Sequence, residues 1–386
     1  MELRIALSDL DYGPEEEEAV MQVIRSRWLT MGAVTQQFEN EFAALCGVQF
    51  TFGLSNGTDA LHLAYLALGI GPGDEVIVPS LTFVATANAA LYTGADVRFA
   101  DVIGPHDLNV SPESIEKQIT PRTKAIAVVH YGGYPCRMPE IMEIARRHGL
   151  AVVEDAAHAP GASLEGRALG AWGDAGCFSF FSNKNLAVGE GGMVITNRAD
   201  VAEKMKTLRS HGMTTLTWDR HRGHAHTYDV VALGHNYRID EIRSALGLAQ
   251  LHKLAKNNAR RKEITARYRA GFQAAGFEGV DLPFMETPGE SSCHIMPILL
   301  PEDVNRGVFM DTMRQAGIQT SIHYPPIHHF SYHSQRYPGL SLPVTEAVAA
   351  REVTLPLYPG LREEDIDYVL STARAAIAAA RQPALT

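Results

Sequence analysis

The sequence predicts an α/β fold, in which a large α/β/α domain with a mostly parallel sheet is followed by a smaller C-terminal α+β domain. Between about residues 57 and 197, short apolar segments alternate with helical patterns, as in a sheet covered by helices. The apolar segments show little polar alternation, which is typical of strands buried on both faces. After about Tyr237 the pattern changes to long helical stretches and separate strands. We expect two domains, 1–250 and 251–386.

The elements of the large domain follow in chain order. Its predicted strands are rich in Val, Ile, Phe and Ala, and they are Glu75–Pro79, Val97–Val102, Ala125–His130, Ala151–Glu154, Gly176–Phe181 and Met193–Thr196. Apolar spacing predicts a helix at Thr58–Leu68, and another at Pro139–His148 that Gly149 ends.

A long helical stretch, Asp240–Lys256, continues through Asn257–Ala275 towards the second domain. In that domain we expect strands at His294–Leu300, Gln319–His323 and Val353–Pro356, and helices at Val304–Ala316, Thr345–Arg351 and Glu363–Ala380.

Composition argues against several classes of protein. The net charge of −10 and the lack of a basic run give no reason to expect nucleic acid or an anionic membrane as a partner. The four cysteines lie far apart, so neither a zinc site nor a disulfide framework is implied. No apolar run reaches the ~18 residues of a membrane span, and the N-terminus lacks the apolar core of a signal peptide. We expect a cytoplasmic protein with reduced thiols.

Three segments carry residues suited to chemistry. In the first, Ser55–Leu61, small and hydroxyl residues precede a predicted helix, whose N-terminus suits a phosphate group. An ordinary helix cap would give the same pattern. In the second, Val152–Ala159, an apolar strand ends in Glu154 and Asp155, with His158 three residues later. Ligands in open α/β sheets bind beyond such strand ends, although Asp155 could equally cap a helix and His158 could be structural.

The third segment, Phe178–Gly192, is a Phe-rich strand that leads into a polar loop with a single lysine, Lys184. A lysine in apolar surroundings has a lowered pKa and can act as a nucleophile towards carbonyl groups. A solvated loop lysine is the ordinary alternative. The order of the three segments, with Lys184 twenty-nine residues after Asp155, favours the chemical interpretation.

With these segments the chain resembles the DegT/DnrJ/EryC1/StrS group of sugar aminotransferases, which have the fold of type I pyridoxal-phosphate (PLP) enzymes. The resemblance covers nearly the whole chain. It is carried by the segments above and by Trp28–Thr30, Gly71–Ser80, Thr82–Thr86, Gly234–Arg238 and Leu355–Leu361. Domain 1–250 is then the PLP-binding domain.

The resemblance also implies the role of each residue. Lys184 matches the lysine that carries PLP as a Schiff base, and Asp155 matches the partner of the pyridine nitrogen, which keeps the ring an electron sink. The remaining matches are Gly57 and Thr58 in the phosphate cradle, Phe83 stacked on the ring, Ser179 at the phosphate or the lysine, and Asn236 at the phosphate of the neighbouring subunit. His158 stands where many relatives carry Gln, which puts its contact with the cofactor's O3′ in doubt.

The implied function is amino transfer from an amino acid, usually glutamate, to a nucleotide-linked keto-deoxysugar, in a homodimer with shared active sites. A carbocyclic acceptor is an alternative. A sugar dehydratase is disfavoured, since relatives with that activity replace the lysine with histidine. A PLP-binding regulator is disfavoured because no DNA-binding domain or broken motif is evident.

Substrate contacts are expected from the segment Ser321–His329, which resembles the family's sugar-side loop. The candidates are Thr30, Arg238, His323, Tyr324 and His329, with Arg238 considered for the donor carboxylate. The pair His328–His329 also suggests a metal. We expect none, because no carboxylate or cysteine lies nearby in the sequence to complete the site.

Overall fold

A seven-stranded sheet forms the centre of the computed structural model, which describes residues 3–215, 227–274 and 276–381. The strand order is β1-β11-β10-β7-β6-β2-β3. Strands from β10 to β3 are parallel to one another, whereas β11 runs antiparallel to both of its neighbours. These strands are β1 (Phe50–Leu54), β2 (Glu75–Pro79), β3 (Asp96–Ala100), β6 (Thr123–Val129), β7 (Ala151–Asp155), β10 (Ala175–Ser179) and β11 (Gly192–Thr196). The predicted fold class is confirmed.

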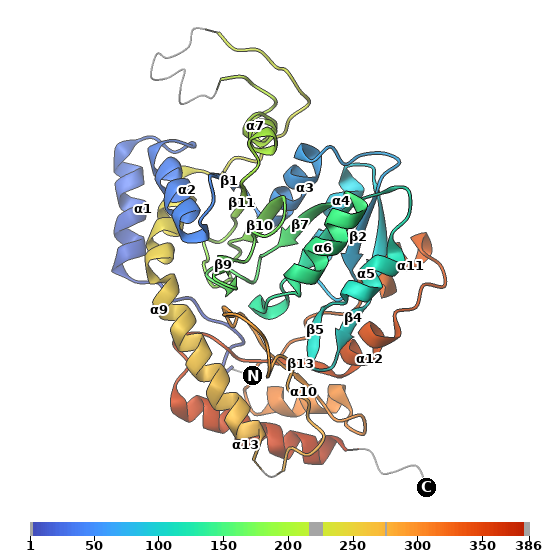
Figure 1. Cartoon of the computed structure of the whole chain (residues 1–386). Helices are drawn as coiled ribbons and strands as arrows, with labels where there is room; N and C mark the ends of the chain where they lie inside the picture. Colours follow the sequence, from blue (N-terminus) through green and yellow to red (C-terminus); the bar gives the residue numbers. More distant parts are fainter. Residues whose placement is uncertain (1–2, 216–226, 275, 382–386) are drawn as a thin grey trace.

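Helices cover both faces of this sheet, so that three layers result (Figure 1). One face packs against α3 (Gly57–Ala67), α4 (Ala85–Tyr92) and α7 (Ala199–Leu208). The other packs against α2 (Ala33–Cys46), α5 (Pro112–Gln118), α6 (Met138–His148) and α9 (Glu241–Phe272), and α1 (Pro14–Ser26) lies on α9. Most strand residues on both faces are buried and apolar, which explains why polar alternation is rare in these segments of the sequence.

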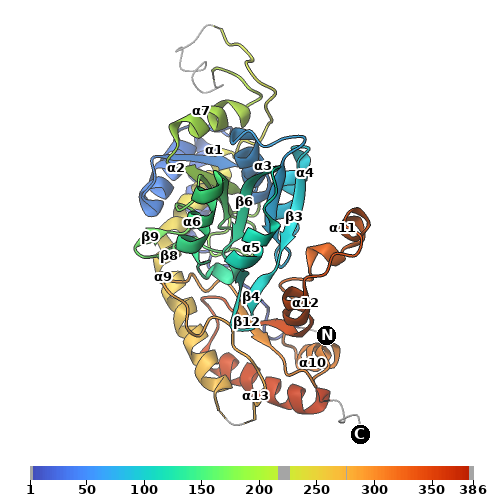
Figure 2. The same cartoon turned by 45° about the vertical axis from the view of Figure 1, so that its right-hand side comes forward.

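The C-terminal part forms a smaller lobe below the sheet in Figures 1 and 2. An antiparallel pair, β12 (Met296–Leu299) and β13 (Glu352–Leu355), packs with α10 (Arg306–Gln315), α12 (Pro343–Arg351) and α13 (Glu363–Ala380). The N-terminal residue Ile5 joins this lobe through a bridge to Ile318. The division at residue 250 stays a prediction, and α9 passes through that position as one continuous helix.

Short elements connect these layers. They are the strand pairs β4 (Val102–Gly104) with β5 (Asp107–Val110) and β8 (Ser163–Leu164) with β9 (Arg167–Ala168), the 3₁₀ turns η1 (Tyr131–Gly133) and η2 (Ile327–His329), and α11 (Ser331–Arg336). None of the helices in the described ranges is long and apolar enough to cross a membrane.

One predicted strand is wrong. Gln319–His323 forms no strand but a loop with a single bridge, from Ser321 to Thr354. The backbone N–H of His323 instead donates to the carboxylate of Glu352 at 2.8 Å, so it is not available for pairing with a strand. Alternating residue types alone could not reveal this partner.

Candidate active site

Lys184 lies in the loop that follows β10, at the edge of the sheet where parallel strands β7 and β10 end together. This edge is where ligands bind in open α/β sheets. Burial lowers the pKa of Lys184 to about 8, and the negative charge of nearby Asp155 opposes that shift. A substantial share of the amine is therefore unprotonated near neutral pH, as a nucleophilic lysine requires.

Asp155 ends β7 and is buried beside Lys184. Its Oδ2 accepts a hydrogen bond from the Thr86 hydroxyl at 2.7 Å, and its Oδ1 accepts one from the Ala157 backbone N–H at 3.2 Å. Burial raises the pKa of Asp155, while these two hydrogen bonds and the Lys184 cation lower it. A cationic ring nitrogen at this carboxylate would relieve the cost of burying it.

The start of α3 packs directly against the end of β10. A Cβ added to Gly57 would lie 2.8 Å from the Cβ of Ser179, so only glycine allows this approach. Asn56 caps the helix by accepting from the Asp59 backbone N–H at 2.9 Å. Asn56 therefore acts as the helix cap. The start of α3 at Gly57 also adjoins the Ser179 hydroxyl, and Thr58 is the next residue of the helix, so a phosphate could bind at this helix start.

Phe83 lies in the loop after β2 with 58% of its surface exposed, an unusual position for a large apolar ring. Its ring centroid is 6.2 Å from that of Tyr324. An exposed aromatic face close to the pocket fits a stacked ligand ring. Together with the Lys184–Asp155 pair and the start of α3, this ring fits the expected arrangement, in which PLP would meet a stacking surface, a base, a counter-ion and a phosphate site.

His158 belongs to the pocket, where two hydrogen bonds hold its ring. Its Nδ1 accepts from the Gly132 backbone N–H at 3.2 Å, so the other ring nitrogen must carry the hydrogen. That Nε2–H donates to the Tyr324 hydroxyl at 3.0 Å, which leaves the Tyr324 hydrogen free to point at a ligand. Burial lowers the pKa of His158 well below its usual value, so the ring is neutral. The role of His158 towards the cofactor stays a prediction.

His294 was missed by the sequence analysis. Its ring lies 4.3 Å from that of His158, and its Nδ1 donates to Asn185 Oδ1 at 2.9 Å. The direction is fixed because the Asn185 amide donates to Asn258 and to the Ser292 carbonyl. His294 Nε2 is therefore a bare, buried acceptor without a partner among the described residues. A histidine that opens an apolar strand gave no signal of this role.

These buried neutral histidines make the fold sensitive to acid. Burial lowers the pKa of His323 to about 4, and the pKa values of His158 and His294 lie well below the ordinary one. In the unfolded chain each takes up a proton near pH 6.5, so below that pH the unfolded state binds more protons than the folded state. We expect the free energy of unfolding to fall by up to about 1.4 kcal/mol per pH unit for each histidine as the pH drops below about 6.5.

Urea unfolding at a series of pH values measures this slope. A His294→Asn variant should show a smaller slope than the wild type, whereas His106→Asn, at an exposed position, should not change it. An identical slope in all three proteins would contradict the prediction.

Three other predicted residues make no hydrogen bond to this cluster within the described ranges. Thr30 and Asn236 are exposed, and in the described part of the chain no hydrogen bond ties either side chain to the Lys184 pocket. Asn236 pairs through its backbone with Ser210 at the base of a projecting segment. Arg238 has a buried Nη1 atom without a partner, and burial lowers the pKa of its guanidinium, with Arg209 adding to the effect. Such an orphaned donor suits an anionic group.

The histidine pair of η2 has a carboxylate beside it after all. Glu346 Oε1 lies 3.1 Å from His328 Nε2 and 3.8 Å from His329 Nε2, so the expectation that no carboxylate lies near is wrong. The fold brings Glu346 there from α12. The same Oε1 also accepts from the Leu342 backbone N–H at 2.7 Å, and His328 Nδ1 bonds to Ser80 Oγ at 2.7 Å. These contacts account for the cluster without an ion, and the absence of a metal stays a prediction.

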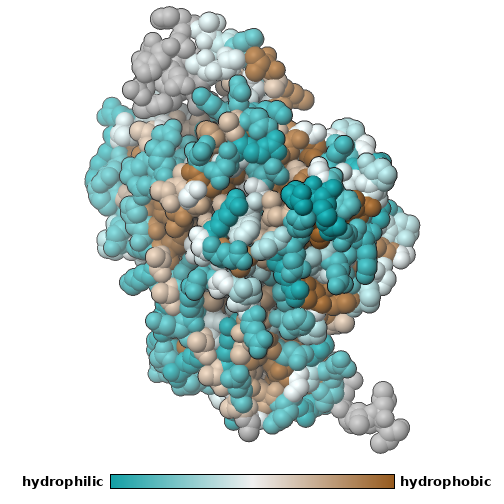
Figure 3. Space-filling view, viewed as in Figure 1, coloured by the Kyte–Doolittle hydropathy of each residue, from teal (hydrophilic) through white to brown (hydrophobic). Residues whose placement is uncertain are grey.

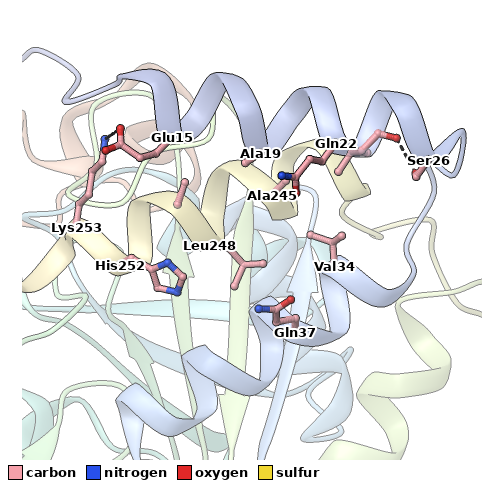
Figure 4. A pocket seen from close by; sticks show the side chains of 12 residues that line it. Glu15, Ala19, Gln22, Ser26, Val34, Gln37, Ala245, Leu248, His252 and Lys253 are labelled. Carbon is pink, nitrogen blue, oxygen red and sulfur yellow. Dashed lines mark hydrogen bonds and ion pairs between the residues drawn. The ribbon is translucent and has the colours of Figure 1, made fainter.

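A separate groove of about 540 Å³ runs between α1, α2 and α9 (Figure 4). Its walls carry Val34 and Leu248, with the Glu15–Lys253 ion pair (3.4 Å) at one end. None of the predicted site residues lines it. The groove is therefore distinct from the Lys184 pocket.

Comparison with known proteins shows similarity along nearly the whole chain. Residues 11–374 match the model of the DegT/DnrJ/EryC1/StrS aminotransferase family. The chain is 40% identical to the spore coat polysaccharide biosynthesis protein SpsC of Bacillus subtilis (strain 168), over 94% of each chain. It is 35% identical to the solved structure of DesV from S. venezuelae, with a TM-score of 0.86 over 94% of each chain. It is 31% identical to DesI, solved in the presence of its TDP-sugar product, with a TM-score of 0.86 over 97% of this chain and 93% of that one.

Proposed function

Because this chain belongs to the DegT/DnrJ/EryC1/StrS aminotransferase family, whose members depend on PLP, we propose that it transfers an amino group from glutamate to a nucleotide-linked keto-deoxysugar. The observation that carries this proposal is the pairing of Lys184, whose pKa is lowered to about 8, with the buried carboxylate of Asp155 at the sheet edge. SpsC and DesI, the one named for polysaccharide biosynthesis and the other solved with a TDP-sugar, support the class of acceptor.

Each residue has a distinct task in this reaction. When bound, PLP supplies an electron sink for the carbon that loses its proton. Lys184 moves the proton at that carbon, since it is the lysine beside Asp155 with a pKa near neutrality. Asp155 holds the ring nitrogen protonated, and the first turn of α3 with Ser179 holds the phosphate. Tyr324 points its hydroxyl hydrogen towards the substrate, and Arg238 is proposed to bind the donor carboxylate through its unpartnered Nη1.

A panel of nucleotide ketosugars and carbocyclic ketones, each incubated with PLP and glutamate, tests the proposal. We expect one nucleotide ketosugar to gain the mass of an amine in place of its carbonyl oxygen, with 2-oxoglutarate formed in equal amount. Amination of a carbocyclic ketone alone would refute the sugar acceptor. Failure of glutamate with success of another amino acid would refute the donor.

A homodimer with shared sites is part of the proposal. The segment around residues 227–235 projects from the body in Figures 1 and 2, and hydrophobic surface lies on it in Figure 3. Val230, Val231 and Leu233 expose 57%, 59% and 91% of their surface. Contiguous exposed apolar residues mark an interaction surface, and a second copy of the chain would bring Asn236 to its partner's cradle.

Complementation between two inactive variants checks this arrangement. A Lys184→Ala protein and an Asn236→Asp protein are each expected to be impaired, because one lacks the lysine and the other places a negative charge at the partner's phosphate. Mixed subunits that exchange should regain turnover, since one of their two sites has both residues. Sedimentation should give a mass of twice 42.1 kDa. If both variants are impaired and a verified mixed dimer of the two does not regain turnover, shared sites are refuted.

We further propose a cytoplasmic location. All four cysteines, Cys46, Cys136, Cys177 and Cys293, are free and buried, as expected in a reducing compartment.

A further inference from the structure

Behind the Lys184 pocket lies a buried carboxylate that the reaction above does not use. Glu352 opens β13 and is fully buried. Its Oε2 accepts from the His323 backbone N–H at 2.8 Å, and its Oε1 accepts from the Thr354 hydroxyl at 2.6 Å. In the described ranges no lysine or arginine forms an ion pair with it, and Arg306 bonds to nearby backbone carbonyls instead. A buried carboxylate without an ion-pair partner lowers the stability of the fold, and a function would explain why Glu352 is present there.

Thr354 connects this carboxylate to the ring of His323. Its Oγ1 lies 2.6 Å from Glu352 Oε1 and 2.8 Å from His323 Nδ1. A hydroxyl has one hydrogen, so Thr354 can donate to only one of these neighbours. When Glu352 is ionised it must accept, and His323 Nδ1 must therefore carry a hydrogen and donate to Thr354. When Glu352 is protonated it can donate to Thr354, which then donates to a bare Nδ1.

The other ring nitrogen of His323 is available to a ligand. In the described part of the chain Nε2 has no hydrogen-bond partner, and it is not among the fully buried polar atoms that lack one. The His323 ring lies 4.9 Å from the ring of Tyr324, whose hydroxyl bonds to His158 in the pocket. Burial, with the nearby Lys184 cation adding to the effect, lowers the pKa of His323 to about 4. A neutral imidazole carries one hydrogen, so Nδ1 and Nε2 always have opposite roles.

We propose that Glu352, acting through Thr354, decides whether His323 offers the Lys184 pocket a proton acceptor or a proton donor. In the forward direction Nε2 takes a proton from a group in the pocket, Nδ1 gives its proton to Thr354, and Thr354 gives its own to Glu352. Three bonds to hydrogen break and three form, and the imidazole stays neutral. Glu352 and Thr354 are thus positioning residues for His323, and Glu352 stores the proton. This inference rests on the proposed function, which makes the Lys184 pocket the place of reaction.

The charge of Glu352 changes in a physiological range. Burial raises the pKa of Glu352 to about 8, opposed by the hydrogen bonds from Thr354 and His323 and by the charge of Arg306 on α10. Above pH 8 we expect Nε2 to be the acceptor, and below it the donor. The titratable groups that face this relay from other elements are Arg306, Tyr131, Tyr324, Lys184, His158 and His294.

Nitrogen NMR of the PLP-loaded enzyme with ¹⁵N-labelled histidine tests the switch directly, with a His323→Asn variant to identify the His323 signals. We expect protonated Nδ1 well above pH 8 and protonated Nε2 well below it. In E352Q the amide donates to Thr354 at every pH, so Nε2 should stay protonated. Thr354→Ser should keep the switch and Thr354→Val should lose it. The same tautomer in E352Q and in the wild type above pH 8 would overturn the proposal.

The NMR measurement needs no turnover, so its outcome is separate from that of the proposed function. A kinetic measurement then tests use of the switch: the rate at which glutamate changes the cofactor's absorbance, as a function of pH. Above pH 8 we expect E352Q and Thr354→Val to be about tenfold slower than the wild type, with Thr354→Ser restored and the exposed Glu302→Gln unchanged. Lys184 also has a pKa of about 8, so the pH profile of the wild type contains the titration of both groups. The difference between the variants and the wild type isolates the effect of Glu352. Wild-type rates and profiles in E352Q would overturn the catalytic role.

Discussion

Replacing Lys184 with alanine is expected to lower kcat by about 10⁴-fold or more, because the variant loses both the nucleophile and the group that moves the proton. We expect no other lysine to substitute, since Lys184 is the lysine whose charge acts on Asp155 in the described part of the chain. The α3 cradle and Asp155 remain, so PLP should still bind without a covalent link.

Two measurements check this result. Turnover of glutamate and the ketosugar gives kcat, and mass spectrometry after borohydride reduction shows whether the peptide with Lys184 carries the cofactor. We expect the adduct in the wild type and in Lys204→Ala, whose lysine lies exposed on α7, but not in Lys184→Ala. Substantial remaining transamination by Lys184→Ala would show that the assignment is wrong.

Asp155→Asn is expected to lower kcat by about 10²- to 10⁴-fold while leaving the fold intact. The amide can still accept from the Thr86 hydroxyl, but it has no charge with which to hold the ring nitrogen protonated. Since burial raises the pKa of Asp155, the ionised carboxylate costs stability in the cofactor-free protein, and the neutral amide removes that cost. The variant should therefore unfold at the same temperature as the wild type or higher when no PLP is bound.

Thermal unfolding of the cofactor-free proteins and kcat of the loaded ones separate these two effects. Thr86→Val, which removes only the hydroxyl partner, should lose about tenfold in kcat and serves as the milder comparison. A near wild-type kcat in Asp155→Asn would refute the role of the negative charge.

Much of the large domain could be predicted from the sequence because buried parallel strands are continuous apolar runs. Predicted Glu75–Pro79 is β2 itself, and the other predicted strands of the large domain lie within one to three residues of those observed. The edge strand β1 was missed, since Phe50–Leu54 is short and carries Gly53. The wrong strand at Gln319–His323 has a different cause, because a buried side chain distant in sequence captures its backbone N–H.

The residues of the site also fall into two groups, those that could be predicted from the sequence and those that could not. Lys184 and Asp155 stand at strand ends, where position along the chain predicts position in space. Such reasoning could not find four other residues, which are Thr86, His294, Thr354 and Glu352. Each acts through a side-chain contact between segments distant in sequence, or through the tautomer that such a contact imposes. In the sequence Glu352 is an ordinary acidic residue before an apolar stretch. Only its complete burial in the structure distinguishes it from other acidic residues.

The continuous helix α9 has a mechanical consequence. At 32 residues it is a rod of about 48 Å, and Asn258 near its middle bonds to Asn185 beside Lys184, while Arg261 one turn later bonds to the backbone of His294 and Leu357 in the lower lobe. The loop that carries Lys184 and the smaller lobe are thus both hydrogen-bonded to α9. The helix is continuous between these two contacts. We infer that the smaller lobe does not rotate towards the large domain to close over the substrate. In the proposed function, selectivity among sugars would then depend on side chains of the loop before η2 and on the neighbouring subunit.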